Sequence, residues 1–264
     1  MNLPKISLDK ETYPLRFTQI LLVSCFIFLS FSLAISATYS LLDTKNLDQD
    51  PIQIGEILTY SVKIKGLPAG TQITKVVEKT TLADQPVYRF RSERQTGSLL
   101  GKLYHFHDQT ESYVTTDQLY PLKYVRDLED QKYRAHVAVD FDHDKGTAQY
   151  TKNSDNKALD MPVGIQDDLS MLYFLRSKQL RVGQTYKLPV LIKDKCEHVT
   201  LEVRRREMIK TKALGRVETL MLRTSHGYLM WLTNDERRIP VRIEAETPRI
   251  GKLVGELEKV DFPD

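Results

Sequence analysis

The sequence predicts an all-β protein, an antiparallel meander that forms a curved sheet or open barrel. We also expect one packed α-helix near residues 167–180 and an N-terminal hydrophobic export or anchor helix. Segments that alternate apolar and polar residues recur about every eight to twelve residues and are joined by short turns, which is typical of antiparallel sheets. Nothing resembles the strand–helix alternation of a parallel sheet. The 13 tyrosines among 264 residues also favour strands.

Residues 1–37 carry an export or anchoring signal. Residues 20–35 form an uncharged apolar run that basic residues precede and small residues follow. This pattern predicts a cleaved signal peptide, and the longer, mainly apolar segment 17–37 is long enough to remain as a transmembrane helix. A third alternative is a lipoprotein, because the residues before Cys25 resemble a lipobox. All three place the body of the protein in the cell envelope, either in the periplasm or anchored to the inner membrane and facing it.

The rest of the chain divides into a polar linker and one domain. We expect the linker at 38–52 and a single mainly-β envelope domain at 53–262. Strands are predicted at 54–65, 72–82, 87–95, 104–115, 122–128, 132–141, 147–152, 185–193, 197–206, 208–212, 216–223, 228–233, 239–247 and 251–257. Turns or loops are expected at 66–70 and 153–166, and 97–102 reads as a short helical turn or an irregular crossing.

The helix near 167–180 is the one strong helical signal after the N-terminus. Asp167 and Asp168 provide capping oxygens and negative charge for its first turn. Apolar residues then follow helical spacing, and cations come near the end, before Gly183. We expect the helix to bury Leu169, Leu172, Tyr173, Leu175 and the stem of Arg176 against the concave sheet. It either seals a dry core or covers a ligand cavity.

Candidate metal and cofactor sites are few. His105 and His107 lie two residues apart, so a strand would place both on one face, but no third ligand is close in sequence. They are weak metal candidates, and no metal site is assigned. The stretch 140–146 has alternating carboxylates but lacks the glycine and glutamate positions of a calcium loop. Nucleotide-binding glycine motifs are absent, so no cofactor is expected.

No catalytic set is apparent. Cys196 has a histidine two residues away, but no oxyanion hole or orienting group is recognisable for this pair. The chain also has no G-x-S-x-G motif, so no nucleophile is assigned. A glycan-directed hydrolase would need a carboxylate pair across a cleft. The candidates for such a pair are Asp140, Asp142, Glu111 and Glu244.

A basic cluster marks one predicted strand. Arg204 and Arg206 share a face and Arg205 opposes them, with acidic residues interspersed. A solvated face explains the cluster most simply, and the alternative is a surface for anionic lipid or glycan. The net charge of +3 gives no indication of nucleic acid binding.

Five stretches carry a resemblance to a known family. They are Gly55-Glu56-x-Leu58-x-Tyr60, Gly66-Leu67-Pro68-Ala69-Gly70, Tyr120-Pro121-Leu122, the stretch 167–176, and the stretch 231–241 with Gly251 and Glu256-Leu257. Their order and spacing resemble the bacterial exported family known as domain of unknown function 3108, over residues from about 53 to 260. The resemblance implies an exported, single-domain, mainly β protein of the Gram-negative envelope. It implies no activity and no site residue.

These observations favour a non-enzymatic envelope protein that binds or carries an amphiphilic ligand or a partner protein. The expected ligand or partner surface is the helix face with Leu169, Leu172 and Tyr173, together with Arg204 and Arg206. If the N-terminal segment is uncleaved, the membrane is one expected partner. The other expected partners are a lipid, a glycan or an envelope protein. The alternatives are an envelope-assembly or structural factor and the hydrolase. A large apolar cavity beneath the helix would favour the carrier, and a filled core with an exposed apolar patch would favour the assembly factor.

Overall fold

The computed structural model of the chain describes residues 51–247 and 251–262. The described residues form an all-β antiparallel meander of 14 strands with one short packed helix, as the sequence predicts. The expectations for residues 1–37, and for the linker as far as residue 50, lie outside the described residues. Of the predicted linker, Pro51 and Ile52 are described, and both are buried on the domain.

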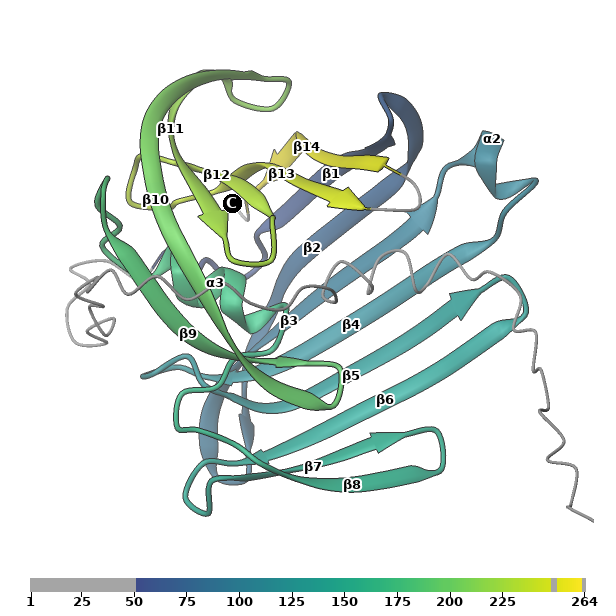
Figure 1. The fold of residues 1–264 in the computed structure, drawn as a ribbon, viewed down its shortest axis with the longest axis vertical. Coiled ribbons are helices and arrows are strands. Elements are labelled where there is room, and N and C mark those ends of the chain that lie inside the picture. Colours follow the sequence, from purple (N-terminus) through teal and green to yellow (C-terminus); the bar gives the residue numbers. More distant parts are fainter. Residues whose placement is uncertain (1–50, 248–250, 263–264) are drawn as a thin grey trace, which may run out of the picture.

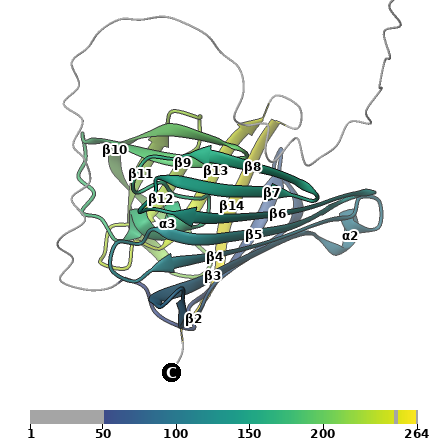
Figure 2. The same ribbon diagram turned by 90° about the horizontal axis from the view of Figure 1, so that it is seen from below.

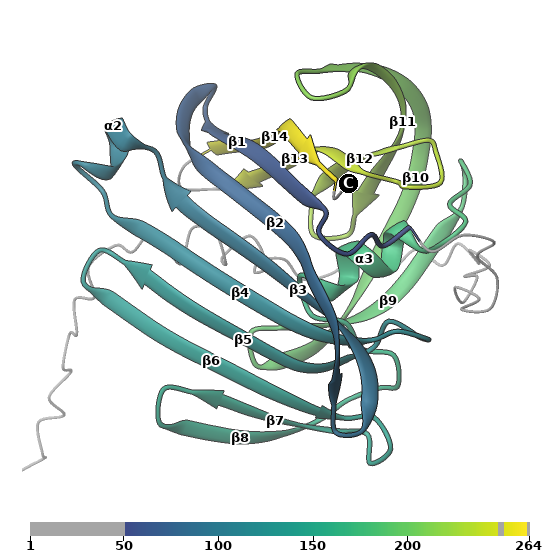
Figure 3. The ribbon, with the colours of Figure 1, turned by 180° about the vertical axis from the view of Figure 1, so that it is seen from behind.

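The strands follow one another in the sheet almost in chain order (Figure 1). They are β1 (Ile57–Ile64), β2 (Leu67–Leu82), β3 (Gln85–Thr96), β4 (Phe106–Thr115), β5 (Pro121–Asp130), β6 (Tyr133–Asp142), β7 (Thr147–Lys152), β8 (Asp155–Asp160), β9 (Thr185–Ile192), β10 (Lys195–Thr211), β11 (Gly215–Thr224), β12 (Leu229–Thr233), β13 (Pro240–Thr247) and β14 (Gly251–Asp261). The order is β8 to β1 and then β14 to β9, so β1 and β14 join the two halves. Figure 3 shows both halves curving toward each other from this junction.

The sheet is not closed, and its two edges are β8 and β9. Side chains still bridge the seam between β8 and the turn after β9. Lys157 Nζ lies 2.9 Å from the Asp194 carboxylate, and the Cys196 thiol donates to the Asp160 carbonyl at 3.3 Å. The edge strand β8 is rich in exposed charged and polar residues, which discourages pairing with another chain.

Two short helices lie at opposite ends of the strands (Figure 2). Helix α2 (Ser98–Gly101) is the short helical turn expected between β3 and β4. Helix α3 (Ser170–Arg176) is the packed helix, and it is shorter than the predicted 167–180. Its start is fixed by Gln166, whose N–H donates to the Pro189 carbonyl while its own carbonyl accepts the N–H of Leu191. These bonds tie the helix to the edge strand β9.

Three sequence expectations need correction. The stretch 153–166 is not all loop, because β8 occupies Asp155–Asp160. The turn predicted at 66–70 is limited to Lys65 and Gly66, since β2 begins at Leu67 and pairs with β1 across a bulge. The predicted strands 197–206 and 208–212 are one strand, β10, with a bulge next to Arg204.

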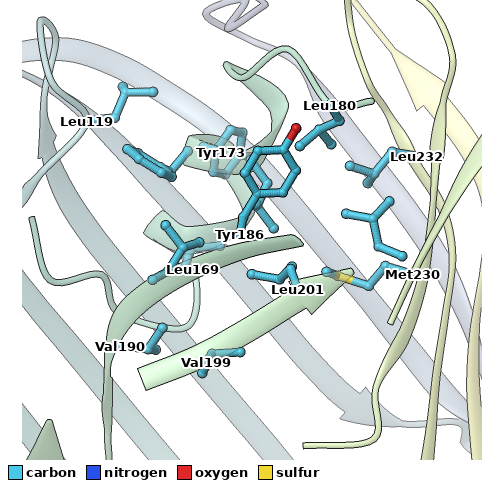
Figure 4. Packing of buried hydrophobic residues seen from close by; sticks show 14 of the residues in the cluster. Leu119, Leu169, Tyr173, Leu180, Tyr186, Val190, Val199, Leu201, Met230 and Leu232 are labelled. Carbon is cyan, nitrogen blue, oxygen red and sulfur yellow. The ribbon is translucent and has the colours of Figure 1, made fainter. Parts of the chain in front are cut away.

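The largest cluster of buried apolar residues lies between α3 and the concave sheet (Figure 4). The Tyr173 ring stacks on Phe90 of β3 with a centroid distance of 3.7 Å. Leu169, Leu175 and residues of β9 to β12 complete this cluster. Strand β12 has buried residues on both faces, and a second cluster around Trp231 packs on the side opposite Met230.

An ion pair fixes the C-terminal end of α3. The Arg176 guanidinium binds both carboxylate oxygens of Glu56, at 2.6 and 2.7 Å, and its Nε donates to the Arg237 carbonyl. Both side chains are fully buried. Burial alone would lower the pKa of Arg176, but the hydrogen bonds to Glu56 raise it above its ordinary value, so the pair is ionic.

Candidate ligand-binding cavity

A cavity of about 780 Å³ lies inside the curve of the sheet. Such a volume is in the range of small-molecule sites, roughly 300–1,000 Å³. Most of its wall is apolar, and residues from both halves of the sheet contribute. Apolar residues of the wall include Val62, Ile64, Leu128, Ala135, Val137, Val139, Val199, Met230, Ile243, Ala245 and Leu253. The concave face is therefore not filled by side chains along its whole length.

Helix α3 forms one end of this cavity. Leu169, Met171 and Leu172 line it, so two of the apolar residues predicted for a ligand surface border the cavity. Tyr173 does not line it, because its ring is fully buried on Phe90. One turn of helix thus presents apolar side chains to the cavity and anchors itself in the core through another face.

The carboxyl group of Asp167 joins the helix start to the cavity. Its Oδ1 accepts the backbone N–H groups of Leu169 and Ser170, at 2.9 and 2.7 Å, which is the predicted capping role. Its Oδ2 accepts the Ser112 hydroxyl at 2.6 Å. Burial, together with the nearby charge of Asp168, raises the pKa of Asp167 to about 7.

A polar patch interrupts the apolar wall on strands β2 to β5. Arg126 binds Asp108 through two bonds of 2.7 and 2.8 Å, and Arg94 binds the same carboxylate at 2.7 Å. Burial alone would raise the pKa of Asp108, but the two guanidinium groups hold it below its ordinary value. The adjoining residues Gln72, Thr74, Ser92 and Thr110 also line the cavity.

Two donors in this patch have no hydrogen-bond partner within the described residues. They are the Nε–H of Arg94 and the hydroxyl of Thr110, and both atoms are buried. Buried polar groups are nearly always satisfied, and an unsatisfied one costs about 1–3 kcal/mol. Both residues line the cavity, so a ligand can supply the missing acceptor.

This patch is not among the sites predicted from the sequence, although β4 carries a signal for it. The buried residues of β4 alternate regularly, and they include Asp108, Thr110 and Ser112. A strand whose inward face is polar is unusual for a filled core and indicates a lined cavity. The sequence alone does not distinguish that face from the outer one, because His107, Gln109 and Glu111 are polar as well.

The structure separates the two histidines considered as metal ligands. His105 Nε2 lies 2.9 Å from Glu129, and His107 Nε2 lies 3.0 Å from Glu93. Each imidazole thus has its own carboxylate partner outside the cavity lining. Among the described residues, no three His, Cys, Asp or Glu side chains gather as a metal site.

None of the four carboxylates considered for glycan hydrolysis lines the cavity. Glu111 binds Arg89, Asp142 binds Lys145, and Glu244 binds Arg242 and Lys252. Asp140 is exposed on β6. The proposed pairs do not share a pocket, and the hydrolase hypothesis built on them is dropped.

The basic cluster lies away from the cavity. Arg204 and Arg206 are exposed on β10, beyond the part that pairs with β9. Arg204 binds Glu202 at 3.0 Å. Arg205 is exposed as well, so the cluster does not divide into an inward and an outward face. The structure does not bring these arginines together with Leu169 and Leu172. In the described part of the chain, no helix combines the length and apolar character needed to cross a membrane.

The fold and the cavity define the class of protein to which the chain belongs. In this class an open antiparallel sheet curves around an apolar cavity, and a short helix lies at one end of the cavity. The chain belongs to the family of proteins of unknown function DUF3108, whose family model matches residues 59–258. No curated protein matches the chain.

At least one solved structure shares this fold. A β-barrel-like protein of the domain of unknown function DUF1849 from Brucella abortus is 13% identical, with a TM-score of 0.56 over 80% of this chain and 99% of that chain. At this identity the two share a fold alone. A DUF1089 family protein from Pseudomonas aeruginosa is 11% identical, with a TM-score of 0.38 over 69% of this chain and 90% of that chain. An exported protein with a YmcC-like fold from Bacteroides fragilis is 11% identical, with a TM-score of 0.30 over 80% of this chain and 97% of that chain. Nothing further rests on these two looser likenesses.

Proposed function

We propose that this protein is a non-enzymatic binding or carrier module of the cell envelope that holds an amphiphilic ligand inside the curved sheet. One observation carries the proposal, the cavity of about 780 Å³ between α3 and the concave face. Its wall is mainly apolar and includes a buried polar patch, which matches the two ends of an amphiphile. Protein interiors are otherwise close-packed, so an empty volume of this size favours a ligand site over a purely structural core.

The exported location is part of the same proposal. It rests on the apolar run at 20–35 and its flanking residues, which have the composition of a signal peptide or membrane anchor. An amphiphile that crosses the aqueous periplasm needs its apolar part covered, and a cavity inside a sheet provides such cover. A lipid is therefore favoured over a glycan as the bound partner.

Filling the cavity is expected to weaken binding of an apolar probe. The probe is N-phenyl-1-naphthylamine, a neutral fluorophore whose emission increases in apolar surroundings. Ala135 lies on β6 with its side chain in the cavity wall, so Ala135→Trp places a large ring inside the cavity. We expect the full-length protein to bind the probe, and Ala135→Trp to weaken binding at least about tenfold, which corresponds to ~1.4 kcal/mol.

The matched control is Ala138→Trp on the same strand. Ala138 is not part of the cavity lining, so its replacement is expected to leave the probe affinity unchanged. Thermal unfolding of both variants checks that the fold is retained. If the unmodified protein does not bind the probe, or if both variants lose binding equally, the cavity is not a ligand site and the proposal fails.

A further inference from the structure

We infer that the ligand is an anionic amphiphile whose acidic head binds Arg94 and Thr110, while its apolar chain lies along the apolar part of the cavity wall. This inference rests on the proposed function and assigns the chemical class of its ligand. It starts from the two buried donors without a partner in the described residues, Arg94 Nε–H and the Thr110 hydroxyl. Both belong to residues of the cavity wall.

The donor chemistry selects an anion. A guanidinium group has donors alone, so Arg94 Nε requires an acceptor. The one carboxylate within the patch, Asp108, is already bound by three guanidinium nitrogens, two from Arg126 and one from Arg94. Two cations therefore share the Asp108 carboxylate, and a carboxylate or phosphate oxygen from a ligand would give Arg94 a second anionic partner. Charge-assisted hydrogen bonds of this kind are the strong ones.

Strand register places the unsatisfied donors side by side. Arg94 pairs across β3 and β4 with Asp108, and Ser92 pairs with Thr110. Arg126 lies opposite Thr110 on β5. Neighbouring strands are about 4.8 Å apart, so one head group can reach both Arg94 and Thr110.

The helix start lies beside this patch. Asp167 and Asp168 border the cavity, and the carboxyl group of Asp167 accepts the Ser112 hydroxyl and two helix N–H groups. Ser112 lies two residues after Thr110 on the same buried face of β4. The carboxyl oxygens at the helix start offer an acidic head no free donor, so the head binds at Arg94 and Thr110, and the apolar chain of the ligand lies on the apolar wall.

The test compares probes that share a chain and differ in the head group. Hexadecanoic acid, hexadecyl phosphate, hexadecanol and hexadecylamine each compete with N-phenyl-1-naphthylamine on the full-length protein. We expect the two anions to bind at least about tenfold more tightly than the amine, with the alcohol between them. The two anions also distinguish a fatty-acid source from a phosphate head group, because the tighter one identifies the source.

Variants locate the head group. Arg94→Gln removes the charge and Thr110→Val removes the hydroxyl at nearly constant shape. Each is expected to weaken binding of the preferred anion about tenfold, and to weaken binding of the neutral probe N-phenyl-1-naphthylamine much less. Arg91→Gln is the matched control, because Arg91 is also on β3 but binds Gln109 outside the cavity lining. It is expected to change nothing.

Thermal stability separates a binding role from a structural one. Because the Thr110 hydroxyl has no partner in the described residues, Thr110→Val is expected to leave the melting temperature of the ligand-free protein unchanged or to raise it. A variant that is as stable as the original and yet loses anion affinity supports the inference. Equal affinity for anion and amine, or an undiminished anion affinity in both variants, overturns it. The proposed function then still stands if the neutral probe binds.

Discussion

Arg176→Met is expected to lower the free energy of unfolding by about 3–5 kcal/mol, because it leaves a buried carboxylate without its cation. Arg176 and Glu56 are both fully buried and bind each other through two short hydrogen bonds. Arg176 also donates to the carbonyl groups of Arg237 and Pro51, which lose those bonds in the variant. Equilibrium unfolding in urea measures the change.

The control is Arg181→Met, which removes an exposed arginine just after the helix and is expected to stay within about 0.5 kcal/mol of the original protein. Glu56→Leu alone should cost about as much as Arg176→Met. The double variant should be more stable than the sum of the single losses predicts, since it contains no unpaired charge. Additive losses, or a loss for Arg176→Met no larger than that of the control, would show that the pair does not hold the helix.

This ion pair brings distant stretches of the sequence together in space. Glu56 precedes β1, Arg176 ends α3, and Arg237 lies in the turn before β13. Tyr60, from the same stretch as Glu56, donates its hydroxyl to the Pro240 carbonyl at 2.9 Å. Three of the five stretches that carry the family resemblance therefore meet at the end of the helix. Their role there is to fix the helix that closes the cavity.

The sequence was sufficient for most of the fold, because alternation in a half-buried strand is a direct record of burial. It failed at β8, where both faces are exposed apart from Leu159 and no alternation appears. It also placed a loop at the start of β2, where Pro68 and Gly70 occur within a strand beside a bulge. These are edge and bulge positions, where local pattern and tertiary pairing disagree.

The site was predicted less well than the fold. Leu169 and Leu172 follow from helical spacing, but spacing did not distinguish the face that lines a cavity from the face with Tyr173 that enters the core. The contact of Arg176 with Glu56 spans 120 residues and leaves no trace in local spacing. The polar patch likewise depends on four strands lying in register, which the sequence of any one strand does not reveal.

The free energy of unfolding of the original protein is expected to fall between about pH 5 and pH 8, and Asp167→Asn is expected to abolish this fall. The pKa of Asp167 is raised to about 7 in the folded protein, against roughly 3.9 in an unfolded chain. Protonation is thus favoured by folding, and the stability it contributes is fully present below the unfolded value and lost as the pH rises through 7. With ~1.36 kcal/mol for each pKa unit, the loss between these pH values is about 2–3 kcal/mol.

Asparagine keeps the arrangement without the charge. Its side-chain oxygen can accept the N–H groups of Leu169 and Ser170, and its amide can donate to the Ser112 hydroxyl. We therefore expect the advantage of the variant in unfolding free energy to be about 2–3 kcal/mol larger at pH 8 than at pH 5. Asp140→Asn, at an exposed position of β6, is the control for other titrating groups. If Asp167→Asn is instead less stable than the original at pH 8, the ionised carboxylate stabilises the start of the helix, and folding does not raise the pKa of Asp167.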